Sequence, residues 1–489
     1  MIDYKHSYKN IKEWNLLTSF NHLLDKDALG QKELLDNKEI TPTELTDFYI
    51  NRIQKHNPKL NAVVTEMFDF AREQAKKQVI GKGPVAGLPF LIKDLAGVKG
   101  VKLTHGSTIL KDFVAPMSDE VVQRYEQAGL IFLGKTNTPE FGFLPTTEPD
   151  LFGPSINPWN EKYSTGGSSG GATSAVAAGL IPFAHASDGG GSIRIPSSAS
   201  GLFGLKPSRG RRPYSPYVNH LSIDHAVTRS VRDSAALLDI IHGSGKHQLY
   251  PGYEKKGSFL ESLNEKPRKL KIAVQYERDS INFDEETRKN MESSIQLMKD
   301  LGHDVVETMP EFDFPTLAHH FINIWLATGA VVINHIAQMS GQEPTEDNIE
   351  SLSYQILKFG KKLSAYDYEE SRVMLEMTSQ QILSFYDDVD IWMTPTLNQV
   401  PFQIGQNKEE VTNAYESMLQ NMLDYNPYMP IANATGQPAM SVPTSWTKEG
   451  VPIGTHFFGR PGEENTLLQL AQQIEKEQPW FYRYKDIHL

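Results

Sequence analysis

From residue 81 onward, short apolar segments alternate with helix-compatible stretches and clusters of glycine. Alternation of strands with helices is typical of α/β proteins, in which helices cover a central sheet. The pattern therefore predicts an α/β fold with a central mixed, mostly parallel β-sheet covered by helices on both faces. The segments with the length and apolar character of buried strands are 88–92, 130–133, 181–186, 390–394, 439–443 and 451–458.

The first 80 residues have a mainly helical pattern and are predicted to form a layer packed on the core. Residues 41–44, Thr-Pro-Thr-Glu, form a capping box with proline at the first helical position, and Asn57-Pro58 is expected to end that helix. A short strand-like segment at 62–65 precedes a second helix at about 66–78. Residues 81–489 are predicted to be a single large domain. It comprises a catalytic core at 81–230, a helical segment at about 257–388, and C-terminal strands at 389–489 that complete the sheet and pocket.

Composition and charge exclude several classes of function. A formal net charge of −12 disfavours a nucleic-acid surface, which needs a positive footprint. The chain has no cysteine, so disulfides, Cys-ligated metals and cysteine nucleophiles are ruled out. Its histidines lack an H-E-x-x-H arrangement, and no metal or cofactor is expected. The polar N-terminal residues, and an apolar stretch at 172–186 that is too short to span a bilayer, predict a cytoplasmic protein without membrane contact.

Two glycine–serine clusters carry the candidate chemistry: GGSSGG at 166–171 and SDGGGSIR at 187–194. A flexible loop is the ordinary explanation of such stretches. Here, however, a helix-compatible alanine-rich run and a short strand separate the clusters, which places each of them at an element boundary. Consecutive glycines at such a boundary expose N–H groups that can stabilise a phosphate or a developing oxyanion.

Two interpretations of these clusters fail on pattern. No lysine follows either cluster, as a P-loop requires, so phosphate binding is disfavoured. Residues 166–170 match the G-x-S-x-G nucleophile elbow, but that motif needs an apolar strand directly before it. The preceding residues 157–163 are polar and turn-forming. An α/β-hydrolase with a Ser-His-Asp triad is therefore disfavoured.

Lys93 ends the apolar segment at 88–92. A solvated lysine at a strand end is the ordinary use of such a residue, but strand ends are also where α/β proteins place catalytic groups. A lysine acting as a base near neutral pH must lose roughly 3 units of pKa, which costs about 4 kcal/mol. Catalysis by Lys93 therefore demands nearly complete burial.

These features together resemble the amidase signature family. The spacing supports the resemblance, because 75 positions separate Lys93 from Ser168 and 24 separate Ser168 from Ser192. DGGGSIRIP and the arginine-rich segment at 206–211 are similar to the freestanding amidase branch that contains the cyclic nylon-oligomer hydrolase. The similarity covers most of residues 40–220 and 390–475, including GLKP at 204–207, NATGQPA at 433–439 and GVPIG at 450–454.

The resemblance implies the amidase signature fold and a Ser-Ser-Lys mechanism. Ser192 would attack the amide carbonyl and form an acyl-enzyme, while Ser168 relays the proton to a neutral Lys93. Gly142 falls where related enzymes place a backbone carbonyl near the substrate, and the aromatic residues Phe141 and Trp159 are candidates for an apolar acyl pocket. The backbone N–H groups placed to receive the oxyanion are those of Gly189, Gly190, Gly191 and Ser192; the predicted supporting side chains are Ser169, Asp188 and Arg194.

The predicted activity is hydrolysis of a linear or cyclic amide other than a peptide bond, which releases a carboxylic acid and an amine or ammonia. The expected partner is only a small-molecule substrate, and the protein is expected to be a monomer or homodimer. One alternative is the glutaminase subunit of a tRNA amidotransferase, although Ile195 and the segment 224–228 depart from its usual pattern. Another is a catalytically idle scaffold, which the presence of all three reactive residues disfavours.

Overall fold

The computed structural model describes residues 21–77, 83–212, 221–245, 252–254, 257–278 and 281–489. Within these residues one sheet of 11 strands forms the centre of the molecule, in the order β1-β3-β2-β4-β6-β5-β10-β11-β9-β7-β8. The strands are β1 (Val63–Glu66), β2 (Pro89–Lys93), β3 (Ile131–Thr136), β4 (Phe183–Asp188), β5 (Phe203–Lys206), β6 (Ile223–Thr228), β7 (Lys271–Ala273), β8 (Asp304–Val306), β9 (Ile391–Pro395), β10 (Ala439–Trp446) and β11 (Pro452–Phe458).

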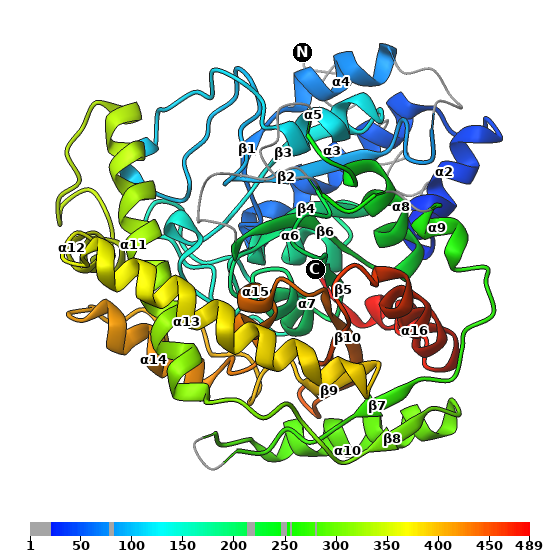
Figure 1. The fold of residues 1–489 in the computed structure, drawn as a ribbon. Helices are drawn as coiled ribbons and strands as arrows, with labels where there is room; N and C mark the ends of the chain where they lie inside the picture. Colours follow the sequence, from blue (N-terminus) through cyan, green and yellow to red (C-terminus); the bar gives the residue numbers. More distant parts are fainter. Residues whose placement is uncertain (1–20, 78–82, 213–220, 246–251, 255–256, 279–280) are drawn as a thin grey trace, which may run out of the picture.

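Helices flank this sheet, which confirms the predicted α/β fold (Figure 1). The α-helices are α2 (Ala28–Asp36), α3 (Pro42–Leu60), α4 (Phe68–Lys77), α5 (Glu120–Gln127), α6 (Gly170–Ala177), α7 (Arg194–Ser200), α8 (Val231–Ile241), α9 (Phe259–Ser262), α10 (Glu285–Asp300), α11 (Phe314–Ser340), α12 (Ser351–Gly360), α13 (Ala365–Ser384), α14 (Ala414–Asp424), α15 (Met429–Thr435) and α16 (Glu464–Glu477). The 3-10 helices are η1 (Asn21–Asp25), η2 (Thr108–Leu110), η3 (Glu140–Gly142), η5 (Phe385–Asp387) and η6 (Phe481–Asp486).

The sheet is mixed, as predicted, but the expectation that it is mostly parallel was wrong. Parallel pairing joins β3 to β2, β2 to β4, β9 to β7 and β7 to β8. All the remaining neighbouring strands pair antiparallel, and these include every pair between β4 and β9 in the strand order. The physical reason is clearest at β10 and β11, because the short turn between Trp446 and Pro452 cannot hold a crossover helix and forces an antiparallel hairpin.

The N-terminal region supplies both helices and an edge strand. The Thr41 capping box is present at the start of α3, as predicted. The helix does not end at Asn57-Pro58 but continues to Leu60, since Asn57 accepts the N–H groups of Ala62 and Val63 through its side chain at 2.9 and 2.8 Å and terminates the helix there. Strand β1 joins the central sheet beside β3. The divisions predicted at residues 80, 230 and 389 remain predictions.

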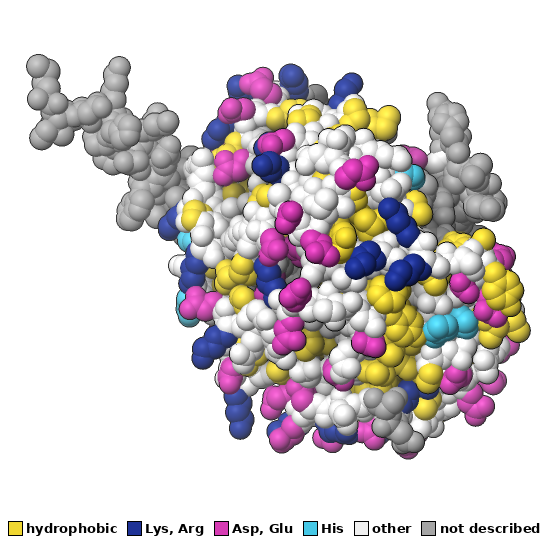
Figure 2. Space-filling view, turned by 90° about the vertical axis from the view of Figure 1, so that its left-hand side faces the viewer, with side chains coloured by type: hydrophobic (Ala, Val, Ile, Leu, Met, Phe, Trp, Pro, Cys, Tyr) yellow, Lys and Arg dark blue, Asp and Glu magenta, His cyan; other side chains and the backbone are white. Residues whose placement is uncertain are grey.

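A second apolar core surrounds α11, which packs against α12, α13 and α14 on one side of the molecule. By length and composition α11 could cross a membrane. The sequence argument, which considered only the apolar stretch at 172–186, overlooked this helix. However, 67% of its apolar window is buried inside the protein, as in the core helix of a folded domain. On the face shown in Figure 2, acidic and basic side chains are intermixed.

Candidate active site

The catalytic candidates meet at one edge of the sheet. Lys93 is the last residue of β2, and β4 runs parallel to β2, so the carboxyl ends of both strands reach the same edge. Ser168 and Ser169 lie directly before α6, and Ser192 lies in the turn that leads from β4 into α7. Active groups of open α/β sheets gather at this kind of edge.

The GGSSGG segment is a packed structural element rather than a flexible loop. All six of its residues are buried. A Cβ atom on Gly171 would lie 2.4 Å from the backbone nitrogen of Asn137, and one on Gly170 would lie 2.2 Å from Thr165 Oγ1. Glycine is required here because neighbouring groups approach the backbone too closely for any side chain.

Lys93 meets the burial requirement that the sequence imposed on it. Its side chain is fully buried, and its Nζ lies 2.7 Å from Ser168 Oγ and 2.9 Å from Ser169 Oγ. Among the described residues, no carboxylate lies within ion-pair distance of this nitrogen. Burial lowers the pKa of Lys93 to about 7, although the negative charges of Asp188 and Asp224 partly oppose the shift. Burial therefore favours the neutral amine that a general base requires.

Lys135 shows what a structural lysine looks like at the same depth. It is also fully buried, but its Nζ forms an ion pair with Asp94 at 2.9 Å. The two lysines lie on neighbouring strands of the same sheet. Lys93 differs because serine hydroxyls, and not a carboxylate, surround its amine.

Ser192 lines a narrow cavity of about 60 Å³. Its side chain is nearly buried, at 9% exposure, and its hydroxyl forms no hydrogen bond within the described part of the chain. Gly142 connects the two serines in space, because it lines the same cavity and a Cβ on it would lie 3.2 Å from Ser168 Oγ. The structure thus joins Ser168 to Lys93 directly, while the proton transfer from Ser192 to Ser168 remains a prediction. Catalytic hydrogen bonds of this kind often tighten only when substrate is bound.

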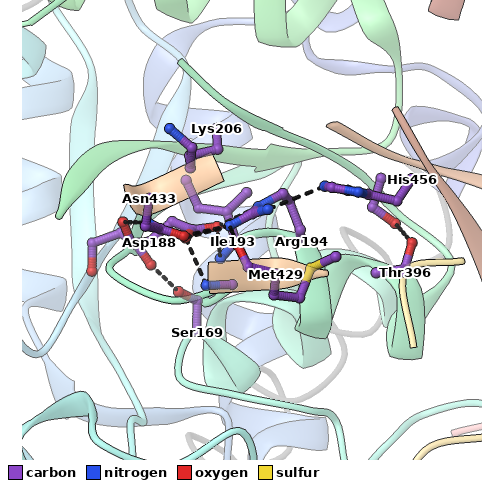
Figure 3. A network of polar contacts seen from close by, with 12 residues as sticks. Ser169, Asp188, Ile193, Arg194, Lys206, Thr396, Met429, Asn433 and His456 are labelled. Atoms are coloured by element: carbon purple, nitrogen blue, oxygen red, sulfur yellow. Dashed lines mark hydrogen bonds and ion pairs between the residues drawn. The ribbon is translucent and has the colours of Figure 1, made fainter. Parts of the chain in front are cut away.

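Asp188 and Arg194 form a buried, two-pronged ion pair that holds the Ser192 turn (Figure 3). Arg194 Nε donates to Asp188 Oδ2 at 2.9 Å and Nη2 donates to Oδ1 at 3.0 Å. Burial alone would raise the pKa of Asp188, but the Arg194 guanidinium outweighs it and holds the pKa of that carboxyl well below its usual range. Both side chains are fully buried.

Three further residues of this network were not predicted as site residues (Figure 3). Asn433, on α15, accepts from Arg194 Nη2 at 2.7 Å and donates to Asp188 Oδ1 at 3.0 Å. His456, on β11, lies 3.1 Å from Arg194 Nη1, and burial followed by the Arg194 charge lowers its pKa well below the usual value. Burial and the same charge lower the pKa of Lys206 to about 7. Lys206 and Asn433 lie in the segments 204–207 and 433–439, which resemble the amidase signature family. That resemblance is the signal that could have identified them.

The predicted oxyanion site needs one correction. Gly191 donates its N–H to Asp188 Oδ1 at 2.8 Å, so this group is already occupied and cannot receive an oxyanion. Within the described residues, the N–H groups of Gly189, Gly190 and Ser192 have no protein acceptor. The role of Gly191 is conformational: its φ of +126° and the 2.8 Å approach of Met429 Cβ to the position of a Cβ both require glycine.

The cavity wall differs from the one predicted. Trp159 does not line it but packs against Trp446 and Tyr484 and donates its indole N–H to Ser200 O at 2.8 Å, so its predicted role in substrate binding was wrong. Phe141 lies behind the wall, in contact with Phe143. The wall comes from the 142–145 loop, the nucleophile turn and distant helices; its members are Gly142, Phe143, Leu144, Pro145, Gly190, Ser192, Ile195, Phe321, Trp325, Met418, Asn421, Met422, Asn426 and Pro430.

A buried lysine bonded to a serine, and a second serine that lines a cavity, form an arrangement expected of a serine hydrolase. Comparison with known proteins agrees with this class. The Amidase family matches residues 44–468, and the chain belongs to this amidase signature family. It therefore hydrolyses amide bonds.

Individual relatives cover nearly the whole chain. The 6-aminohexanoate-cyclic-dimer hydrolase of Pseudomonas sp. is 32% identical over 94% of this chain and 96% of its own length. The putative amidase AmiB2 of Mycobacterium tuberculosis is 35% identical over 93% of this chain and 97% of its own length. A solved structure of 6-aminohexanoate cyclic dimer hydrolase superposes with a TM-score of 0.88 at 32% identity and covers 94% of this chain and 98% of that one. The predicted similarity to this branch is confirmed.

Proposed function

We propose that this chain hydrolyses small uncharged amides through an acyl-enzyme on Ser192, with Ser168 and Lys93 as the proton relay. The observation that carries the proposal is the fully buried Lys93, whose Nζ lies 2.7 Å from Ser168 Oγ and whose pKa falls to about 7. A neutral amine in this position can accept a proton that histidine accepts in a Ser-His-Asp triad. A charged lysine at the surface could not accept this proton.

The reaction follows from the positions of these groups. Ser192 Oγ attacks the amide carbonyl while its proton passes to Ser168, and Ser168 passes its own proton to Lys93. The free N–H groups of Gly189, Gly190 and Ser192 are available to the developing oxyanion. The relay then runs backwards and protonates the leaving nitrogen, and the amine departs. Water attacks the remaining ester with the same groups as base, which releases the acid and restores Ser192.

The cavity supports an uncharged substrate. Among the described residues no lysine, arginine, aspartate or glutamate lines it, and a buried charge without a partner is costly. One relative is named a hydrolase of the cyclic dimer of 6-aminohexanoate. Cyclic or linear amides without a charged acyl group are therefore the proposed substrates. The protein is proposed to act in the cytoplasm as a monomer or homodimer.

The nucleophile can be identified with a serine-reactive fluorophosphonate. We expect the native protein to gain the mass of one phosphonyl group, which peptide mapping places on Ser192, with loss of activity in proportion. Ser192→Ala should gain no phosphonyl group. The control Ser200→Ala, at the last residue of α7 and outside the cavity, should label fully. Labelling of another serine would contradict Ser192 as the nucleophile. No labelling in folded protein would contradict the proposal and favour an idle scaffold.

The pH dependence of kcat/KM should report the titration of Lys93. Because the neutral amine is the active form and burial lowers its pKa to about 7, activity is expected to fall as the pH drops below that value. The expected slope is about tenfold per pH unit well below the pKa. A pH–rate profile between roughly 5 and 9 with a neutral amide measures it, and the range brackets the pKa. A profile that stays flat down to the lower limit would exclude Lys93 as the base.

A further inference from the structure

Asn426 stands out in the cavity wall because its side-chain amide is buried and has no partner among the described residues. It is 7% exposed, and within the described part of the chain its carboxamide forms no hydrogen bond, with Oδ1 wholly buried. A buried polar group without a partner costs roughly 1–3 kcal/mol. Most buried side-chain amides are satisfied, so an orphaned one beside a nucleophile indicates that a ligand completes it.

The backbone holds Asn426 in a fixed position relative to Ser192. Its N–H donates to Asn421 O at 3.2 Å, and its carbonyl accepts the N–H of Met429 at 3.2 Å. The carbonyl of Met429 in turn accepts from Arg194 Nη2 at 3.0 Å. Because Arg194 also holds the nucleophile turn, the orphaned carboxamide and Ser192 are parts of one rigid frame.

Apart from the catalytic groups and the half-buried Asn421, the described wall of the cavity is apolar, and one other side chain in it has a buried polar atom without a partner. The indole N–H of Trp325 is buried without a partner. Its ring stacks on Phe321, with centroids 5.8 Å apart, and lies over Gly189, where a Cβ would be 3.1 Å from the ring. A substrate group that fills this space therefore meets mostly hydrocarbon, and the buried unpaired side-chain atoms that it meets among the described residues are those of Asn426 and Trp325.

We propose that Asn426 is a specificity-determining residue that hydrogen-bonds a second, uncharged amide group carried on the acyl chain of the substrate. A carboxamide offers an NH₂ group that donates and a carbonyl oxygen that accepts, and an amide group on the substrate offers the complementary groups. An apolar acyl chain leaves Asn426 unsatisfied, and a carboxylate enters a wall that has no cation to pair with it. The inference rests on the proposed function, since it assigns the acyl group of the same reaction.

Three chromogenic nitroanilides of matched shape test this inference. Their acyl groups are glutaramoyl, which ends in a carboxamide, its apolar isostere methylhexanoyl, and glutaryl, which ends in a carboxylate. We expect kcat/KM to be about tenfold or more higher for the glutaramoyl anilide than for either of the others. Asn426→Leu should remove most of the preference for glutaramoyl over methylhexanoyl.

Asn421→Leu is the matched control variant. Asn421 lines the same wall on α14, but its side chain is half-buried and can reach solvent. The preference should therefore remain when Asn421 is replaced. Equal rates for the glutaramoyl and methylhexanoyl anilides in the native protein, or equal loss of preference in the two variants, would overturn the inference. Failure of all three anilides to turn over in a Ser192-dependent manner would instead count against the proposed function.

Discussion

Replacing Lys93 by methionine is expected to lower kcat at neutral pH by about 10⁴-fold or more, as for loss of a member of a catalytic triad. Methionine matches the buried volume of the lysine stem but cannot accept a proton from Ser168. The Ser168 hydroxyl then has no base at 2.7 Å, so Ser192 must attack without activation. Steady-state hydrolysis of a neutral nitroanilide measures the loss.

Two controls accompany this variant. The double variant with Ser192→Ala should be no slower than Ser192→Ala alone, because the groups act as one unit. The free energy of unfolding should be unchanged or higher. The lowered pKa of Lys93 means that the folded state carries a destabilised cation below about pH 7, a cost that disappears as the pH rises toward the ordinary lysine value. A variant that kept activity within tenfold of native would refute the relay.

Replacing Arg194 by methionine is expected to destabilise the protein by about 3–5 kcal/mol, because it leaves the Asp188 carboxylate buried without its cation. Arg194 also bonds Asn433 at 2.7 Å and Met429 O at 3.0 Å, so the loss spreads to α15. The denaturant midpoint should fall, and activity should fall with it since the Ser192 turn loses its brace. Urea unfolding followed by tryptophan fluorescence measures the change.

The appropriate comparison is the double variant Asp188→Asn with Arg194→Met. Removing the charge at both positions eliminates the unpaired carboxylate, so the double variant should be more stable than Arg194→Met alone. Asn at this position keeps an oxygen for the N–H of Gly191. An Arg194→Met protein that unfolds at the native midpoint would show that the pair does not brace the turn.

The candidate catalytic residues could be predicted because the signal for them lies in short local sequence motifs. Lys93, Ser168 and Ser192 each lie in a short motif at an element boundary. In the structure Lys93 contacts Ser168, and Ser192 lines the cavity. Of the predicted oxyanion site, the structure excludes the N–H of Gly191, and the roles of Gly189, Gly190 and Ser192 stay predictions. Nothing in the sequence indicates that Asp188 turns its carboxylate back onto the N–H of Gly191, since that depends on the pull of Arg194 and Asn433 on the other side.

The cavity wall was not predictable because it is assembled from distant segments. Phe321 and Met418 come from helices more than a hundred positions beyond Ser192, and their amphipathic patterns are indistinguishable from those of ordinary core residues. Trp159 was placed wrongly for the same reason, since an aromatic side chain near a motif can pack in either direction. The sheet likewise departed from expectation where hairpins such as β10–β11, and not crossover helices, join neighbouring strands.

The pairing of β5 with β10 has a consequence for the order in which the molecule is made. Leu205 of β5 pairs with Met440 of β10, so a growing chain leaves that strand edge unpaired while more than two hundred further residues are synthesised. An unpaired edge is a template for association with other chains. The ribosome also releases Lys93, Ser168 and Ser192 long before Asn433 and His456, which complete the frame around Arg194. The nascent protein therefore holds its reactive residues without an organised site, and hydrolysis begins only after the C-terminal strands have been added.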